Sequence, residues 1–330
     1  MNKKKLIQMM LAVTLPGVAT FGTISITDNL GVRGFVQGSY ETTEIGTTTD
    51  TESLDMNWAD VDFLFSSEKV GAEVHLKSDG STVDLEQAFL TYDLGGGLNV
   101  TGGKYLSLLG YEGDEPYKLY QRSMAYKWAD GANNKIPFAA YHQGVKIAFS
   151  SGDLSGAISV VDDVYNSGGS NDGDSKDVGF EAQIKYTGLE NFTIAIGTAQ
   201  SGSGDVTAAT TAAKGNNTTD DYYNFWVEYG GIDSLILGAE YNSYKAGATG
   251  GTDGDSWMLM GNYSVNEKLG VTLRLSEVEE KGTTTYEADK FTISPSYSFS
   301  DSLLGRIEYS TGEIDGDDAD YFSIEALFTF

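Results

Sequence analysis

The sequence predicts an all-β fold, a transmembrane antiparallel β-barrel, and three observations carry this prediction. The last ten residues alternate between apolar and mostly polar side chains and end on the aromatic Phe330. Segments of about ten residues with the same alternation recur along the chain. The connections between them alternate between short turns and longer polar loops, whereas a soluble β-sandwich has no reason to sort its connections by length.

The final strand is expected over residues 321–330. One face carries Phe322, Ile324, Ala326, Phe328 and Phe330, and the other carries Tyr321, Ser323, Glu325, Leu327 and Thr329. This period of two gives a strand one apolar and one mostly polar face, which a half-buried strand of a soluble β domain would also show. The terminal aromatic residue resembles the closing strand of a bacterial outer-membrane barrel, an end that the assembly machinery reads.

Residues 1–19 are predicted to be a secretory signal peptide that is cut after Ala19. Three lysines at 3–5 precede an apolar run over 6–18, which ends in small residues. The run is too short and too interrupted by polar residues and Pro16 to be a membrane span, although a short membrane anchor is the alternative. The chain is therefore expected to be exported, with residues 20–330 forming one outer-membrane barrel domain.

The composition narrows the function classes. The chain has 41 Gly, 20 Tyr and 15 Phe but no Cys, which excludes a disulfide scaffold and thiolate metal sites. Its net charge of −27 at pH 7 argues against nucleic acid as a partner. The slightly polar mean hydropathy is compatible with a barrel, because only alternate residues of each strand face lipid and the others face the lumen.

About 16 strands are expected, with 14 or 18 as alternatives, and an even number places both termini in the periplasm. Short turns are expected over 67–69, 95–97, 150–153, 187–190, 230–233, 264–267 and 299–302. Longer polar loops are expected over 41–56, 105–140, 162–177, 200–220, 244–254, 279–285 and 312–319. The alternation over 84–104 does not decide which side chains face lipid. Pro295 predicts a bulge or an early strand end between Phe291 and Tyr297.

The segment over 105–140, a long third external loop, departs from the strand pattern. Pro116 follows an acidic cluster and predicts the start of a short helix, on which Leu119, Arg122 and Tyr126 would share a face. Loops of this length usually either function or are disordered, and the aromatic and apolar content of this one disfavours disorder. We expect it to fold into the lumen and narrow it as a constriction loop; the alternative is an external cap over the barrel.

Charged residues on the two sides of the lumen predict a pore constriction. The pore wall would supply Arg33, Lys77, Lys146, Arg274 and Arg306, and the loop would supply Glu112, Asp114, Glu115 and Arg122. Opposite charges that face each other across a narrow aqueous pore create a transverse field, which orders water and dipolar solutes. The alternative is that these charges only solvate the lumen.

Other chemistry is weakly signalled. The two histidines, His75 and His142, both fall on polar strand faces, and nothing positions an activating partner beside a serine, so no enzyme is expected. The acidic runs over 171–174 and 315–318 offer oxygen ligands for Ca²⁺ but do not fit the spacing of a helix-loop-helix calcium site. They are expected to be solvated loops, with divalent ions that bridge lipopolysaccharide as the alternative. No cofactor and no metal site are predicted.

One motif carries a resemblance to a known family. The run Gly-Gly-Lys-Tyr-Leu-Ser-Leu-Leu-Gly-Tyr-Glu over 102–112, followed by Glu115-Pro116 and Leu119-Tyr120-Gln121, is similar to the OmpL-like β-barrel porin family, as is the terminal Phe330. The resemblance spans essentially the mature chain, but only the motif over 102–121 is distinctive. It implies a barrel pore for small solutes and supplies neither catalytic residues nor a ligand.

These observations together predict an outer-membrane porin that allows passive diffusion of small hydrophilic solutes or ions. The negative charge predicts a weak cation preference, and the expected partners are the lipid bilayer, lipopolysaccharide and the solutes. The size of the chain is compatible with a homotrimer, of which the sequence carries no direct signature. The alternatives are a plugged barrel that acts as an adhesin or structural anchor through its external loops, and a soluble secreted β-protein.

Overall fold

A computed structural model describes residues 22–126, 128, 141–162, 178–200, 221–245, 253–282 and 285–330. The predicted signal peptide over 1–19, most of the second half of the predicted constriction loop and the acidic run over 171–174 lie outside the described residues. No helix in the described part of the chain is long and apolar enough to cross a membrane.

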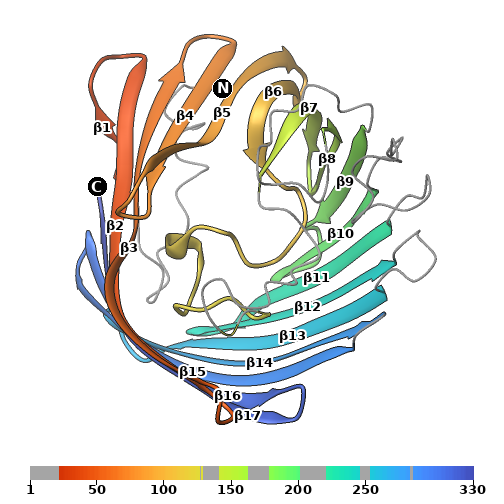
Figure 1. Cartoon of the computed structure of the whole chain (residues 1–330). Helices are drawn as coiled ribbons and strands as arrows, with labels where there is room; N and C mark the ends of the chain where they lie inside the picture. Colours follow the sequence, from red (N-terminus) through yellow and green to blue (C-terminus); the bar gives the residue numbers. More distant parts are fainter. Residues whose placement is uncertain are drawn as a thin grey trace, which may run out of the picture.

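The described residues form a closed antiparallel barrel of sixteen strands, as predicted (Figure 1). Each strand from β2 to β17 pairs with the next, and β17 returns to pair with β2, with Ile324 opposite Tyr40. A two-residue strand, β1 (Ile24–Ser25), adds to β2 outside this count. The barrel strands are β2 (Leu30–Ile45), β3 (Thr49–Ser66), β4 (Val70–Ser78), β5 (Val83–Gly95), β6 (Leu98–Leu106), β7 (Tyr141–Ser151), β8 (Leu154–Val161), β9 (Gly179–Tyr186), β10 (Phe192–Gln200), β11 (Asp221–Ile232), β12 (Leu235–Lys245), β13 (Asp253–Ser264), β14 (Leu269–Lys281), β15 (Tyr286–Ser300), β16 (Leu303–Ile314) and β17 (Asp317–Thr329).

The terminal residue completes the closing strand pair. Phe330 and Gly34 exchange two backbone hydrogen bonds of 2.9 Å each, so the chain end belongs to the β17–β2 ladder. The ring of Phe330 covers Gly34, where an added Cβ would approach the ring to 2.6 Å. Glycine at this position therefore allows the terminal aromatic ring to lie against the neighbouring strand.

The two faces of each strand meet different surroundings. In β17, Ile324 and Phe328 point outward and are 49% and 45% exposed, whereas Ser323 and Glu325 point inward and are buried. The same apolar outer face recurs around the barrel, for example at Leu90, Ile147, Ile158, Ile184, Ile196 and Leu259. Lipid cannot satisfy polar groups, so apolar side chains cover the outer face and polar ones gather inside.

The predicted alternation of short turns with long loops is wrong at several connections. The strands β2 and β3 continue to a turn over 46–48, and β16 and β17 continue to Asp315-Gly316, where we expected loops over 41–56 and 312–319. Asp315 and Gly316 have φ of 52° and 86°, the left-handed pair that a tight two-residue hairpin requires. Segments rich in Thr and in charged residues therefore extend these strands beyond the apolar band. Where both faces of a strand meet water, such segments form β-ladders as readily as apolar ones.

A β-bulge explains why the lipid-facing side over 84–104 could not be assigned. His75 pairs with Gln87 and Leu76 with Leu85, so Glu86 is an extra residue in β5. Leu85 and Leu90 are 48% and 56% exposed on the outer face although an odd number of positions separates them. The bulge shifts the parity between these two leucines, and an uninterrupted period of two cannot describe the strand.

Neither a bulge nor an early strand end, the two outcomes predicted for Pro295, is found there. β15 runs through Pro295 to Ser300, and its register with β16 is the same at Ile293 and Ser296, on either side of the proline. The ladder with β16 skips only the positions in between, since proline has no N–H to donate. The bulge in this strand pair lies further on, between Ser298 and Ser300.

Candidate functional site

The lumen holds the first half of the predicted constriction loop, residues 107–126, which we call the inner loop. It leaves the end of β6 and lies within the ring of strands (Figure 1). Its only helical turn among the described residues is a 3₁₀ turn at Pro116–Lys118, after which Leu119 is extended. The helix begins where the sequence predicts but does not continue to Tyr126. Barrel side chains bond the backbone groups that a longer helix would have paired internally.

Arg306 of β16 binds three carbonyl groups of the inner loop. Its guanidinium donates to the carbonyl oxygens of Leu119 and Gln121 at 2.6 and 3.0 Å and to that of Pro116 at 3.0 Å. The same group pairs with Glu325 of β17, and both side chains are fully buried. A guanidinium offers five donors in a fixed plane, which suits one residue to hold several acceptors at once.

Arg274 and Lys290 hold the next part of the inner loop. Arg274 of β14 donates to the carboxylate of Glu112 at 2.7 Å and to the carbonyl oxygen of Ser123 at 2.8 Å. Lys290 of β15 donates to the carbonyl oxygen of Met124 at 2.8 Å. The side chain of Arg274 is fully buried and that of Glu112 is 8% exposed, so this pair of opposite charges lies under the loop rather than across open water.

Carboxylates of the same wall bind the N–H groups of the inner loop. Glu308 accepts from the amides of Arg122 and Ser123 at 2.7 and 2.9 Å. Glu240 of β12 accepts from the amide of Tyr111 at 2.7 Å, and Glu181 of β9 accepts from that of Leu108 at 3.2 Å. Basic side chains therefore bind the carbonyl groups and glutamates bind the amides, at points of the loop backbone from β9 to β16.

The other predicted charges lie where the inner loop does not cover the wall. Arg33 of β2 and Lys77 of β4 are 23% and 34% exposed and pair with Asp62 and Glu86 at 2.7 and 3.6 Å. Lys146 of β7 lies 4.5 Å above the ring of Tyr105. All three therefore belong to the part of the inner wall formed by β2–β8. Arg274 and Arg306 lie elsewhere, in β14 and β16.

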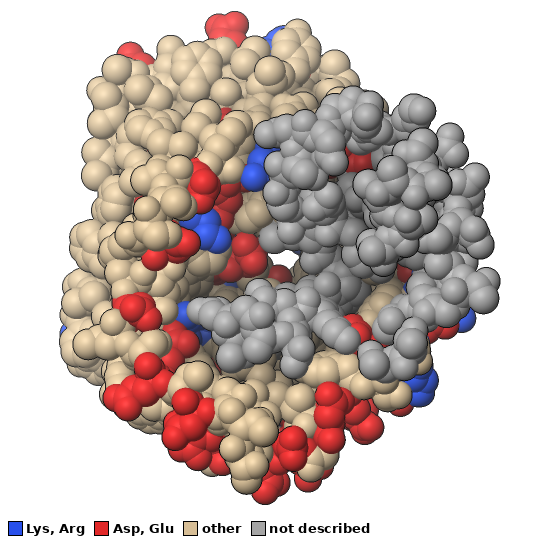
Figure 2. All heavy atoms as spheres, viewed as in Figure 1, with Lys and Arg blue, Asp and Glu red and all other residues tan. Residues whose placement is uncertain are grey.

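The remaining predicted loop charges contact the β2–β5 side of the lumen. Arg122 pairs with Glu41 of β2 at 2.7 Å. Glu115 is buried and pairs with Lys118 at 2.5 Å. A cavity of about 100 Å³ lies between the inner loop and β2, β3 and β17 and is lined in part by Gln37, Glu41, Trp58, Asp114, Arg122 and Tyr321. Figure 2 shows a hollow in this face of the molecule with acidic and basic side chains along its rim.

Sequence reasoning missed the residues that position the inner loop. It took the basic residues of the polar strand faces as wall charges and named none of the carboxylates Glu181, Glu240 and Glu308, nor Lys290. The sequence does contain a signal for these four residues. Each is a charged residue at an inward position of a strand, where a buried charge needs a partner. The sequence could not show that the partner would be a backbone group of the inner loop.

A closed sixteen-strand barrel with a polar inner face and a loop bound inside it defines a porin-type protein of the outer membrane. The model of the family described as "Putative beta-barrel porin-2, OmpL-like" matches residues 33–330, and the chain belongs to this family. No curated protein matches the chain at a significant level.

Solved outer-membrane barrels are similar in fold. OmpF of Salmonella typhi in complex with daunomycin superimposes with a TM-score of 0.70 at 13% identity, covering 94% of this chain and 100% of that one. The channel DcaP of Acinetobacter baumannii gives 0.67 at 14% identity, with 93% and 99% covered. A loop-deletion mutant of OmpT of Vibrio cholerae gives 0.66 at 16% identity, with 92% and 100% covered. At these identities the likeness establishes the fold alone.

Proposed function

We propose that the barrel is an outer-membrane pore through which small hydrophilic solutes and ions diffuse passively. The observation that carries this proposal is the division of the inner wall: the inner loop is bound along β9–β17, while charged side chains of β2–β8 remain partly exposed inside the barrel. Arg33, Glu73 and Lys77 all point inward and are 23%, 31% and 34% exposed. Water therefore reaches this wall past the inner loop, and no cofactor or reaction is needed to drive diffusion.

The same division supports a weak cation preference. Arg274 and Arg306 are fully buried beneath the inner loop, so their charges are compensated by Glu112 and Glu325 and by loop carbonyl groups. They contribute little to the field that an ion in the open part of the lumen experiences. The acidic groups next to that part include Glu41 and Asp114, which line the cavity beside the inner loop, and Glu73, which is 31% exposed. The chain as a whole has a net charge of −27.

Single-channel recording in a planar bilayer tests the proposal. Refolded protein comprising residues 20–330 should give stable conductance steps, and a KCl gradient should give a reversal potential of the sign that marks a small excess of cation flow. A reversal potential of the opposite sign would overturn the cation preference. Well-folded, membrane-inserted protein without steps would overturn the pore and would support a plugged barrel that acts as an adhesin or anchor.

The cellular setting follows from the same proposal. Residues 1–19 would direct export, the apolar outer face would contact lipid, and the outer rim would meet lipopolysaccharide. A structure of OmpT of Vibrio cholerae is described as a trimer form, which supports a homotrimer here. Chemical crosslinking in native outer membranes would show a trimeric band, and a purely monomeric band would contradict the homotrimer while leaving the pore in place.

A further inference from the structure

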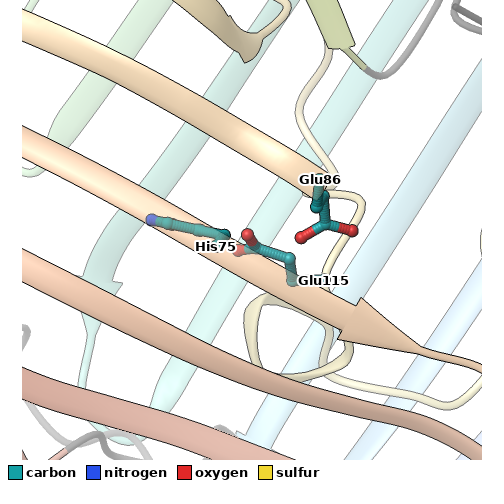
Figure 3. A group of neighbouring side chains, drawn as sticks. All are labelled: His75, Glu86 and Glu115. Carbon is teal, nitrogen blue, oxygen red and sulfur yellow. The ribbon is translucent and has the colours of Figure 1, made fainter. Parts of the chain in front are cut away.

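Three buried side chains that can each bind a metal ion meet where the inner loop contacts β4 and β5. His75 of β4, Glu86 of β5 and Glu115 of the inner loop each place a nitrogen or carboxylate oxygen within 4.8 Å of the other two. Their residues are 2%, 4% and 2% exposed. Figure 3 shows the carboxylate of Glu115 pointing toward the His75 ring, with the carboxylate of Glu86 on its other side.

The β-bulge in β5 builds this cluster. Glu86 is the extra residue of the bulge, so it and its neighbour Gln87 both point into the barrel. In a regular strand one of them would face lipid. Bulges are frequent next to functional sites because they redirect a side chain that a regular ladder would point elsewhere.

A second observation is a buried carboxyl group for which the described residues supply no hydrogen-bond donor. Asp60 of β3 is 2% exposed, and neither of its carboxylate oxygens has a hydrogen-bond partner within the described residues. Its carboxylate lies next to those of Glu86 and Asp62. A buried carboxylate beside two others is costly unless a proton or a cation compensates it.

Among the described residues, carboxyl groups outnumber the basic side chains that pair with them here. The carboxyl groups around His75 are those of Asp60, Asp62, Glu73, Glu86 and Glu115, and Arg33, Lys77 and Lys118 pair with members of this group. A bound divalent cation would take the place of protons shared between the buried carboxyl groups.

Both ring nitrogens of His75 lie close to carboxylate oxygens. Nε2 lies 3.0 Å from Glu73 Oε2, and Nδ1 lies 3.0 Å from Asp62 Oδ1. Nδ1 also lies 3.0 Å from Nε2 of Gln87, and the same amide lies 3.5 Å from Glu115 Oε1. When Nε2–H donates to Glu73, Nδ1 is the nitrogen that can bind a metal ion, which then replaces the contacts of Nδ1 with Asp62 and Gln87.

We propose that His75, Glu86 and Glu115 bind a divalent transition-metal ion, for which Zn²⁺ is the best-fitting probe, with Asp60 as a neighbouring fourth ligand. One imidazole nitrogen with carboxylate oxygens suits Zn²⁺ better than Ca²⁺ or Mg²⁺, which prefer oxygen ligands alone. Two ligands about 2.1 Å from one Zn²⁺ ion lie at most about 4.2 Å apart, so the side chains close in slightly when the ion binds. The Lys118 ammonium, 37% exposed, swings away from Glu115.

The ion would add a link between the inner loop and β4 and β5, which the loop already contacts through the amide of Gln87. Glu115 comes from the inner loop, whereas His75 and Glu86 come from β4 and β5. The site does not depend on the proposed conduction, because a plugged barrel would present the same ligands. Zinc binding and channel recording can therefore fail separately.

Zinc titration of refolded protein in detergent micelles tests the site. Isothermal titration calorimetry should show one Zn²⁺ bound per chain, and Co²⁺ should give visible d–d absorption that Zn²⁺ abolishes. Glu86→Gln and Glu115→Gln should each weaken binding by about tenfold or more, since each removes a charged ligand. Lys118→Ala should tighten it, because the competing ammonium is gone.

His142 provides the matched control. It is the second of the two histidines in the chain, and it is buried with its Nε2 3.0 Å from Glu181 Oε1. His75→Gln should abolish the high-affinity site while His142→Gln retains it, with folding verified for each by the heat-dependent shift in electrophoretic mobility. Should His75→Gln fail to fold, the loop variants Glu115→Gln and Lys118→Ala decide the question.

Three outcomes would overturn the proposal. The first is wild-type protein that binds no Zn²⁺ at neutral pH, where a proton held between the buried carboxylates is then the compensating charge. The second is equal affinity of the His75→Gln and His142→Gln proteins. The third is weak Zn²⁺ binding with an affinity that the substitutions at 86, 115 and 118 leave unchanged. Such ions would be bound by the acidic external loops.

Discussion

The two parts of the inner wall use the same side chains in different ways. Along β9–β17, Arg274 and Arg306 are fully buried and bind carbonyl groups of the inner loop. Along β2–β8, Arg33 and Lys77 are partly exposed and pair with the wall carboxylates of Asp62 and Glu86. An inward arginine in a barrel therefore either fixes a loop or shapes the field of the lumen, and burial beneath the loop decides which.

The largest effect is expected from Arg306→Ala. The change leaves Glu325 buried without its cation and frees the carbonyl groups of Pro116, Leu119 and Gln121, so unfolding in denaturant should become easier by about 3–5 kcal/mol. Arg33→Ala, on the partly exposed wall, is the matched control and should cost distinctly less. Equal losses of unfolding free energy for the two variants would contradict the claim that arginines beneath the inner loop stabilise the protein more than arginines on the partly exposed wall.

A smaller loss is expected from Glu308→Gln. An amide has a single carbonyl oxygen to offer the N–H groups of Arg122 and Ser123, so this part of the inner loop should loosen at a cost of about 1–3 kcal/mol. Single-channel recordings should then show higher conductance and more open-channel noise. Glu279→Gln, in an exposed pair with Lys281, serves as the control and should leave both unchanged. Unaltered conductance in Glu308→Gln would mean that the inner loop does not limit the pore.

Selectivity should respond to Lys146→Gln, with little change in stability. Removing this cation from the β2–β8 wall should move the reversal potential in a KCl gradient toward greater cation preference. Because mobile ions screen charges beyond about 3 Å at 1 M salt, the shift should shrink as the salt concentration rises. A shift that is insensitive to salt would indicate a structural change in the lumen rather than a change in its field.

The smallest effect concerns the external turn between β4 and β5. Hydrogen bonds from the Ser81 hydroxyl and from the amides of Ser81 and Thr82 lower the pKa of Asp79 to about 2. A lowered folded-state pKa means that these bonds stabilise the turn above the ordinary pKa of about 4 and are lost as the pH falls toward 2. A carbon-13 NMR titration should show this low pKa, and Ser81→Ala should raise it. An ordinary pKa in the wild-type protein would show that the turn is not closed as described.

Sequence reasoning reached the architecture because membrane and lumen impose a local rule. A strand between lipid and water repeats with a period of two, so β17 and most other strands could be recognised along with their inward residues. The rule failed at Glu86, where a bulge shifts the parity, and at Asp315-Gly316, where polar strands extend beyond the membrane. In both places the deciding factor was pairing with a neighbouring strand, which the alternation of one segment does not contain.

Only part of the candidate site could be named from the sequence, because Glu181, Glu240, Glu308 and Lys290 were not singled out and the arrangement was not predicted. All the predicted wall and loop charges lie on the lumen side of the barrel. The helix expected beyond Pro116 did not extend because Arg306, 190 positions away along the chain, binds its carbonyl groups. The helix propensity of the residues near Pro116 contains no information about so distant a partner.

The sequence by itself therefore determined the barrel, an even strand number of about sixteen and the inward side of most strands, since lipid and water act on every strand residue individually. Only the tertiary structure decided which charges meet water and which meet the inner loop. It also brought His75, Glu86 and Glu115 together from two strands and the inner loop. Those contacts depend on the path of the inner loop across the lumen, which is set by hydrogen bonds between residues far apart in the chain.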